Sequence, residues 1–535
     1  MVLQKYFEYF SPRVTPQTQP IPGAGQVLND AGGYTWAVDL WMRLDRFLVL
    51  GTEGGAYYSS ERQLTVENAQ AVAASLQSDG MRAVARIVEI SESGRAPKND
   101  PALFALAMAA ALGDAATRQA ALAALPQVAR TGTHLFHFLA YVEAFRGWGR
   151  GLRRAVATWY TNKPAAALAY QAVKYQQRDG WTHRDALRLA HPKALTNQQE
   201  ILFHWMVKGW ETVGETPHPE EAVRLIWAFE RVRRVERLND VIELIERYDL
   251  PWECVPSQWL GKADVWRALL PKLPITALLR NLARVTAGGA LSALSAEVAT
   301  VTRKLGDRDV LRKARIHPIA VLAALTTYAA GRGGRGSLRW EPIPAVVDAL
   351  DRAFYLAFGN VEATGKRIVL ALDVSGSMSG GSVAGVRGLT PRTAGAAMAL
   401  VTATAEPTVT TIGFSHEMVP LAISPRQRLD DVIRLTDNLP FGRTDCAQPM
   451  LWALERGVKA DAFVIYTDSE TWFGQIHPAQ ALQAYRRKTG IAAKLVVVAM
   501  TSNGFSIADP EDAGMLDVVG FDAAAPQVIS DFIVS

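Results

Sequence analysis

Apolar residues recur at three- and four-residue spacings through the first 360 or so positions, which is the period of amphipathic helices. Short breaks at Gly, Pro or Asp separate these segments, as between antiparallel helix pairs. No fixed-period repeat is present, so we interpret the region as a stack of divergent helix pairs. The clearest predicted helices cover residues 101–129, 153–160, 167–178, 220–232, 264–270, 316–330 and 343–358.

The pattern changes after the Gly- and Arg-rich break at 331–340 and the helix that follows it. Short apolar runs rich in β-branched residues now alternate with helical segments, which is typical of a parallel sheet covered on both faces. We therefore predict two domains, a helical one over 1–360 and a Rossmann-like α/β one over 361–535. The predicted strands are 367–374, 408–415, 462–468 and 494–500, and the predicted helices between them are 392–405, 449–458 and 477–488.

Composition narrows the class of protein. Hydrophobic residues make up 49% and charged residues 20% of the 535, the balance of a soluble globular chain. No apolar run reaches the roughly 18 residues of a membrane span, and the start, MVLQKYFEYF, lacks the pattern of a secretory signal. Cys254 and Cys446 are the two cysteines, too few for a disulfide framework. We expect a cytoplasmic protein with no membrane partner, and a monomer because no coiled-coil seam is evident.

Charge is unevenly distributed along the chain. The net charge is +5, but residues 367–535 carry 13 basic and 17 acidic side chains, a net charge of −4, which leaves +9 for the rest. Residues 141–193 alone hold 10 basic and 3 acidic side chains, a net charge of +7. Such a dense basic stretch is a candidate binding surface for a polyanion, and the alternative is a solvated helix face.

The first predicted strand of the α/β domain runs into Asp373-Val-Ser375-Gly-Ser377, where one carboxylate and two hydroxyls can converge in a tight turn. Such hard oxygen ligands suit Mg²⁺, with Mn²⁺ as the alternative. Thr444 and Asp468 add oxygen ligands after later strands. Asp-x-Ser-x-Ser, then Thr, then Asp resembles the metal-ion-dependent adhesion site of von Willebrand factor A domains, which implies an acidic protein ligand on the metal. The alternative is that these side chains only cap helices.

No catalytic constellation is recognised. There is no phosphate-binding GxxxxGK[ST] loop, Ser375 stands where a second carboxylate would be needed, and Cys446 has no His near it in sequence. The closest histidine pair, His134 and His137, lies in an apolar helix, and we interpret it as core or interface. We expect a protein that is not an enzyme.

The basic stretch offers several candidate RNA contacts. Lys174 and Arg178 are four residues apart, which would place them on one face of the predicted helix, where they could hold successive phosphates. Tyr175 and Trp181 could stack on bases, although core packing is the favoured interpretation of both. The RNA-binding candidates are Arg150, Lys174, Arg178, Arg184 and His191.

The chain from about residue 25 to its end resembles the Ro ribonucleoprotein autoantigen family, whose members combine a TROVE domain with an A domain. The matched segments are Gly33–Trp36, Arg46–Tyr58, Gly147–Arg150, Lys174–His191, Lys313–Pro318, Thr364–Arg367, Asp373–Met378, Thr444–Cys446 and Thr501–Pro510. Two positions depart from the family pattern. Gln176 replaces a Lys that is common in vertebrate members, and Arg443 replaces a Gly beside the metal ligands, where it could crowd the metal or await an acidic ligand.

The resemblance implies a HEAT-like ring of helical repeats closed by the A domain. It implies small noncoding Y RNAs bound on a basic outer surface, through Lys174, Arg178 and His191, and single-stranded 3′ ends of misfolded RNAs in the ring's central hole. It also implies the metal ligands Asp373, Ser375, Ser377, Thr444 and Asp468. Bacterial members resemble adaptors that bring RNA to the exoribonuclease polynucleotide phosphorylase, so we expect a role in RNA quality control and degradation.

Two other functions remain open from the sequence. The first is a protein-adhesion scaffold, in which the metal site captures an acidic partner and the basic face is merely solvated. The second is a metal-dependent phosphotransferase or nuclease that uses Asp373.

Overall fold

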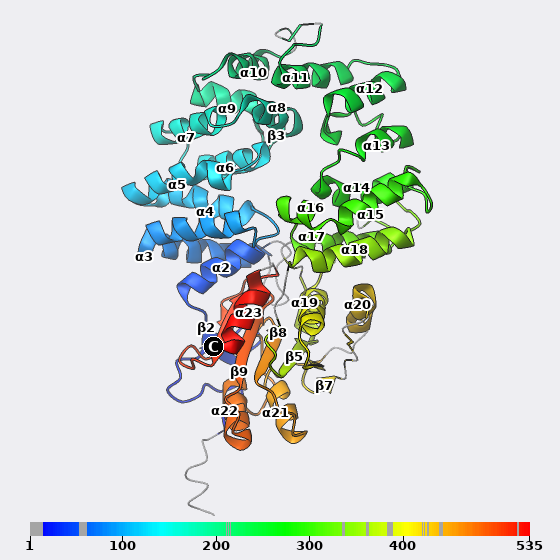
Figure 1. Cartoon of the computed structure of the whole chain (residues 1–535). Coiled ribbons are helices and arrows are strands. Elements are labelled where there is room, and N and C mark those ends of the chain that lie inside the picture. Colours follow the sequence, from blue (N-terminus) through cyan, green and yellow to red (C-terminus); the bar gives the residue numbers. More distant parts are fainter. Residues whose placement is uncertain are drawn as a thin grey trace, which may run out of the picture. The chain divides into compact units, whose positions relative to one another are not determined.

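The computed structural model divides the chain into two compact units (Figure 1). One unit is Ala69–Ala357, and the other combines the chain up to Asn68 with Phe358–Ser535. Glu53–Tyr58, part of one segment that carries the family resemblance, lies outside the described residues. The structure describes residues 14–52, 61–209, 211, 213–214, 216–333, 337–359, 363–381, 383, 389–419, 421, 423–424, 427–437, 442–521 and 524–535.

The helical unit consists of helices that contact the next helix along the chain and, more extensively, the next but one, as in a stack of helix pairs. The predicted helix over 101–129 is interrupted at Gly113, after which the Asp114 side chain caps a new helix by accepting from Thr117 N at 2.7 Å. None of the helices in the described ranges is long and apolar enough to cross a membrane. The helices are α3 (Glu61–Ser93), α4 (Asp100–Leu112), α5 (Ala115–Val128), α6 (Gly132–Phe145), α7 (Arg150–Thr161), α8 (Ala165–Lys174), α9 (His183–Ala190), α10 (Asn197–Lys208), α11 (Glu221–Val232), α12 (Leu238–Tyr248), α13 (Ala263–Leu269), α14 (Ile275–Ala287), α15 (Ala296–Gly306), α16 (Arg308–Lys313), α17 (Pro318–Ala329) and α18 (Pro344–Ala357).

The helical array returns to its own beginning. The Arg315 guanidinium donates to the carbonyl of Glu92 at 2.7 Å, and His317 Nε2 donates to the carbonyl of Arg95 at 3.1 Å. These bonds join the end of α3 to the connection between α16 and α17, more than 200 residues later in sequence. The helical unit is therefore closed by contacts within the unit itself.

The second unit is built on a six-stranded sheet in the order β11-β9-β8-β5-β6-β7. Five strands are parallel, and β7 pairs antiparallel with β6 at the edge, so the prediction of a wholly parallel sheet was wrong there. The chain reverses directly after β6, where Ser415 N donates to the carbonyl of Glu417, leaving too few residues for a crossover helix. The strands are β5 (Ile368–Asp373), β6 (Val409–Phe414), β7 (Met418–Val419), β8 (Ala462–Thr467), β9 (Lys494–Ala499) and β11 (Met515–Val519).

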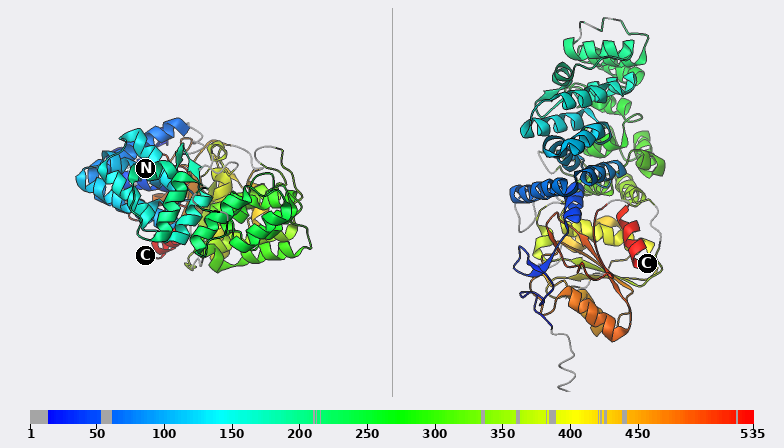
Figure 2. Two further views of the ribbon diagram at one scale, coloured as in Figure 1. Left: turned by 90° about the horizontal axis from the view of Figure 1, so that it is seen from above. Right: turned by 90° about the vertical axis from the view of Figure 1, so that its left-hand side faces the viewer.

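Helices cover both faces of this sheet, as Figure 2 shows. Alternate residues of the central strands, among them Val369 and Phe463, pack with α21 (Gln448–Glu455) and α22 (Pro478–Thr489). The opposite face meets α19 (Pro391–Ala405), where the backbone at Gly395 lies close to Tyr466. Every residue of β5 and β8 is buried, which explains their continuous apolar sequences. The remaining helices are α20 (Leu429–Asp437) and α23 (Ala524–Val534).

The predicted domain boundary at residue 360 lies within three residues of the observed one, but the chain up to Asn68 was assigned to the helical domain and packs with the α/β unit instead. There β1 (Val27–Leu28), β2 (Tyr34–Ala37) and β10 (Phe505–Ser506) form a small antiparallel sheet. The next helix, α2 (Leu40–Leu50), contacts β11. The physical reason is that side chains of this segment, above all Arg46, pair with residues of the α/β unit. The local sequence does not reveal this pairing.

Candidate metal centre and nucleic-acid interface

The candidate metal residues lie where neighbouring strands end. Asp373 is the last residue of β5, and Asp468 directly follows β8, the adjacent strand in the sheet. Because these strands are parallel, their carboxyl ends meet at one edge, where ligands of α/β proteins bind. After β5 comes a short 3₁₀ turn, Gly376–Ser379. Ser375 directly precedes this turn, and Ser377 lies within it.

Hydrogen bonds connect most of the predicted ligands into one buried cluster. Asp373 accepts from Ser375 N at 2.9 Å and, through its other oxygen, from Thr467 Oγ1 at 2.7 Å. The hydroxyls of Ser375 and Ser377 are 3.1 Å apart, and Ser377 also bonds to the Asp468 carboxylate. No side-chain capping bond opens the 3₁₀ turn, so helix capping does not account for the serines.

Thr444 lies in a loop held against this cluster. The loop is tied on one side by Gly376 N, which donates to the carbonyl of Gly442 at 3.3 Å. On the other side the carbonyl of Thr444 accepts from the backbone nitrogens of Trp472 and Phe473, each at 3.1 Å. Thr444 itself is buried, and its hydroxyl makes no hydrogen bond to the other four candidate ligands, all of which are described residues. The structure therefore brings four of the five residues into direct contact and sets the loop of the fifth beside them.

In this cluster, buried acidic side chains outnumber buried basic ones. Burial raises the pKa of Asp373, and burial together with the Asp373 charge raises the pKa of Asp468 to about 7. Burial and the Asp468 charge also raise the pKa of Glu470, to about 9. The buried Arg392 guanidinium opposes the shift at Asp373, but it is hydrogen-bonded to the carbonyls of the turn, at 2.6 Å and 3.0 Å.

A bound cation would compensate this charge. The described residues contain no group of three or more His, Cys, Asp or Glu side chains able to hold a metal, so hydroxyl oxygens would have to complete the site. Two carboxylates with serine and threonine hydroxyls form the hard oxygen donor set that Mg²⁺ prefers. The donor chemistry and the uncompensated charge both fit the predicted cation.

Arg443 lies on aromatic rings. Its guanidinium is 4.8 Å from the ring centroid of Phe473 and 5.6 Å from that of Trp472. These cation–π contacts hold an exposed positive charge one residue from Thr444.

The predicted basic surface forms from α7, α9 and the hairpin between α8 and α9. Arg150 opens α7, Arg184 lies in the first turn of α9, and His191 ends α9 in the left-handed conformation, and all three are exposed. The rings of Trp148 and Trp181, 5.6 Å apart, hold the starts of the two helices together. Trp181 is buried, which confirms the interpretation of core packing, whereas Tyr175 is only half-buried.

The prediction that Lys174 and Arg178 share a helix face was wrong. Helix α8 ends at Lys174, and Arg178 lies in a hairpin in which β3 (Gln177–Arg178) pairs with β4 (Trp181–Thr182). Asp179 and Gly180 form the two-residue turn, with φ of 50° and 80°. Asp-Gly pairs favour two-residue hairpin turns in which both residues have positive φ. The pair in the sequence therefore indicates a hairpin at this point, not a continued helix.

The two basic residues consequently differ in exposure. The Arg178 side chain is 58% exposed, beside Asp179, whereas that of Lys174 is 10% exposed. Lys174 Nζ lies 3.6 Å from a Glu253 carboxylate oxygen and 3.3 Å from the Tyr170 hydroxyl. Of the histidines interpreted as core or interface, His137 instead bonds Asp179 in the hairpin turn, and His134 is half-buried.

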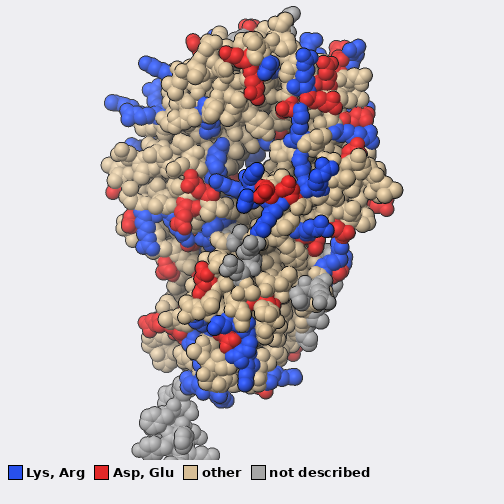
Figure 3. Space-filling model, viewed as in Figure 1, with Lys and Arg blue, Asp and Glu red and all other residues tan. Residues whose placement is uncertain are grey.

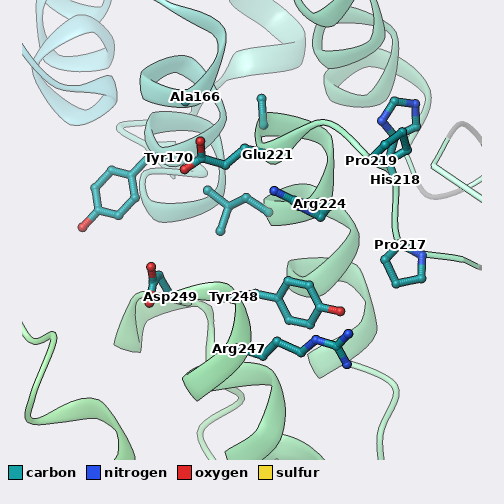
Figure 4. Close-up of a pocket in the computed structure, with 12 residues that line it drawn as sticks. Ala166, Tyr170, Pro217, His218, Pro219, Glu221, Arg224, Arg247, Tyr248 and Asp249 are labelled. Carbon is teal, nitrogen blue, oxygen red and sulfur yellow. The ribbon is translucent and has the colours of Figure 1, made fainter.

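A cavity of about 690 Å³, shown in Figure 4, adjoins Lys174 through Tyr170. Tyr170, from α8, and Arg224, from α11, lie on one side, facing Tyr248 and Arg247 at the end of α12. The sequence did not indicate this cavity, because its lining joins α8 to α11 and α12, which are distant from α8 along the chain.

The sequence matches two family models, the TROVE domain over residues 27–327 and the Ro60 vWA domain over 367–533. This chain belongs to the Ro60 family. It is 46% identical, over 98% of both chains, to the RNA-binding protein RO60 of Deinococcus radiodurans. It is 36% identical to the RNA-binding protein RO60 of Caenorhabditis elegans, over 95% of this chain and 90% of the relative.

The fold agrees with Ro60-family membership. The crystal structure of the Deinococcus radiodurans RO (RSR) protein superposes with a TM-score of 0.71 at 45% identity, covering 93% of this chain and 99% of that one. The predicted fold class, a helical-repeat domain with a von Willebrand factor A-like domain, is thus confirmed. The Ro60 vWA match contains all five candidate metal ligands, and the TROVE match contains the whole basic surface.

Proposed function

We propose that this protein binds RNA through the surface formed by α7, α9 and the hairpin at 177–182. The observation that carries the proposal is the exposure of Arg150, Arg178, Arg184 and His191 on neighbouring elements of the TROVE domain, in a family whose curated relatives are named RNA-binding proteins. Guanidinium contacts to phosphates supply affinity that does not depend on sequence.

The proposed ligands are small structured Y RNAs on this surface and misfolded RNAs with a single-stranded 3′ end in the central hole. The self-closed helical array supports the second part, because a closed array can surround a single strand and exclude a duplex. The protein would act without catalysis, as a cytoplasmic monomer that presents RNA for degradation, with polynucleotide phosphorylase as the proposed exoribonuclease.

The 690 Å³ cavity supports binding of an unpaired base close to this surface. Tyr170 and Tyr248 offer ring faces, and Arg224 offers a planar guanidinium, the groups on which unstacked bases commonly lie. Lys174 lies between Tyr170 and Glu253, so we expect it to orient the Tyr170 ring rather than to contact a phosphate.

Binding of a Y-RNA-like stem-loop should depend steeply on salt, and the triple variant Arg150→Ala/Arg178→Ala/Arg184→Ala should reduce that dependence. Each lost phosphate contact lowers the slope of log K against log salt by about one unit, so we expect a loss of about two to three units. Affinity at low salt should fall at least tenfold. Filter binding across a salt series measures both quantities.

A triple variant with three exposed arginines at α11–α12, Arg231→Ala/Arg233→Ala/Arg237→Ala, is the matched control and should bind as the parent does. Equal loss in the two variants would contradict the assigned surface. Magnesium-dependent RNA cleavage that disappears in Asp373→Ala would instead establish the nuclease.

A second function is favoured by the buried acidic cluster. We propose that Asp373, Ser375, Ser377, Thr444 and Asp468 hold Mg²⁺, or Mn²⁺ in its place, and that an acidic protein ligand completes the coordination. Arg443, fixed on Phe473 beside the site, would provide a second positive group for that ligand.

A further inference from the structure

A second cavity, of about 550 Å³, lies where the two ends of the helical array meet. One wall comes from residues 94–99, between α3 and α4, and from 130–134 at the start of α6. The opposite wall comes from α14 and from the α16–α17 segment, residues 314–328. The bonds that close the array, from Arg315 and His317, lie in this wall.

Three arginines line the cavity and no carboxylate does. Arg130 comes from the first wall, and Arg280 and Arg315 come from the second. Among the described residues, no carboxylate oxygen lies within 4 Å of any of these three guanidiniums. Figure 3 shows Lys and Arg side chains, with Asp and Glu side chains among them, around a hollow in the helical unit.

Two of the arginines are held close together in spite of their like charge. The pKa of Arg130 is lowered, first by burial and then by the charge of Arg315, with Glu92 acting in the opposite direction. The Arg130 guanidinium nevertheless stays in place, because it donates to Ser91 Oγ at 2.8 Å and to a backbone carbonyl at 3.3 Å. Arg315 is fixed by its bond to Glu92.

The rest of the lining suits an anion that carries an organic group. Leu279, Leu282 and Tyr328 supply an apolar wall, and Asn99 and Thr276 supply neutral hydrogen-bonding groups. Burial, with the charge of Arg130, lowers the pKa of His134 to about 3, so at neutral pH the ring is uncharged and adds no fourth positive charge. Three guanidiniums that form no ion pair with a carboxylate among the described residues match the oxygens of a phosphate, which arginine forks bind in a bidentate manner.

We infer that this cavity binds a phosphate group, which Arg130 from one end of the array and Arg280 and Arg315 from the other hold between them. The bound phosphate would attract the arginines on both ends of the array, which otherwise repel one another. Binding would therefore strengthen the contact of residues 92–95 with 314–317. The inference does not depend on the proposed RNA surface, because none of its three arginines belongs to that surface.

The phosphate can come from a small anion or from an RNA chain, and the test separates these sources. The full chain is titrated calorimetrically with inorganic phosphate, with pyrophosphate and with a single-stranded hexauridylate, at constant ionic strength set by chloride. Hydrogen exchange of residues 92–95 and 314–317 is followed in parallel. Saturable binding that slows exchange in both segments is expected for at least one of the three probes.

Arg280→Gln is the decisive variant, because Arg280 is exposed and makes no hydrogen bond that the fold requires. Its affinity for the bound probe should fall at least tenfold, and the protection of both segments should disappear. Arg284→Gln, one turn further along α14, exposed and outside the cavity lining, should behave as the parent does.

Binding by phosphate or pyrophosphate identifies a small-anion site, and binding by hexauridylate alone identifies the RNA backbone as the source. The inference is overturned if no probe binds, or if Arg280→Gln and Arg284→Gln bind the probe equally. The triple variant at Arg150, Arg178 and Arg184 should keep this binding, so its outcome is separate from that of the proposed RNA surface.

Discussion

Addition of Mg²⁺ to the metal-free protein is expected to raise the melting temperature of the α/β unit, and Asp373→Asn is expected to abolish that rise. A ligand that binds only the folded state stabilises it by about 2.7 kcal/mol when its concentration is 100 times its dissociation constant. The gain arises because the cation neutralises Asp373 and Asp468, which are buried and repel one another. Differential scanning calorimetry with and without Mg²⁺ measures the shift.

Asparagine keeps the shape of Asp373 and can still accept from Ser375 N, so the fold should survive the change. Without metal, removal of one of two repelling charges should leave the stability of the unit unchanged or higher. Thr444→Val, which conserves side-chain size, should weaken the Mg²⁺ effect without abolishing it. Asp531→Asn, an exposed change on α23, is the matched control and should retain the full shift. An undiminished Mg²⁺ shift in Asp373→Asn would exclude the predicted centre.

The central sheet and its metal residues could be predicted because their signals are local. Strands β5 and β8 are buried along their whole length and mostly apolar, and Asp373 and Asp468 stand at their carboxyl ends, so the parallel arrangement implies that these two residues lie close together. Burial of the entire strand leaves no polar alternation that could suggest another structure. The two-residue strand β7 has too little sequence to carry such a signal.

The RNA surface was predicted only in part, because helix periodicity and turn chemistry disagree at its centre. Apolar spacing continues past Lys174 and suggested a helix through Arg178. The Asp179-Gly180 pair overrides it, since both residues adopt positive φ and reverse the chain into a hairpin. At this position the turn preference of Asp-Gly outweighs the helix propensity of the residues before it.

The place of the N-terminal segment could not be read from its sequence. Strand β2, of four residues, pairs with β10, of two residues, more than 450 positions away. Buried polar side chains complete the contact, such as Asn29, which donates to the Thr471 carbonyl at 2.9 Å. Pairing between such distant short segments leaves no periodic pattern in either of them.

Arg46→Met is expected to destabilise the α/β unit by about 3–5 kcal/mol, the usual cost of removing one partner of a buried ion pair. The Arg46 side chain is fully buried, and its guanidinium donates to both oxygens of Asp517 at 2.8 Å and 2.6 Å. It also donates to the backbone carbonyls of Asn503 and Phe505, at 3.0 Å and 2.8 Å. Urea unfolding followed by a probe in the α/β unit measures the loss.

The matched control is Arg434→Met, which breaks the exposed pair with Asp431 and should cost less than about 1 kcal/mol. In the double variant Arg46→Met/Asp517→Leu, neither buried charge remains unpaired, so part of the lost stability should return. Equal losses in Arg46→Met and Arg434→Met would show that the N-terminal segment contributes little to the stability of the unit. A large loss in Arg46→Met alone would mean that α2 is held to β11 by one buried charge pair, which is why a segment so distant in sequence belongs to this unit.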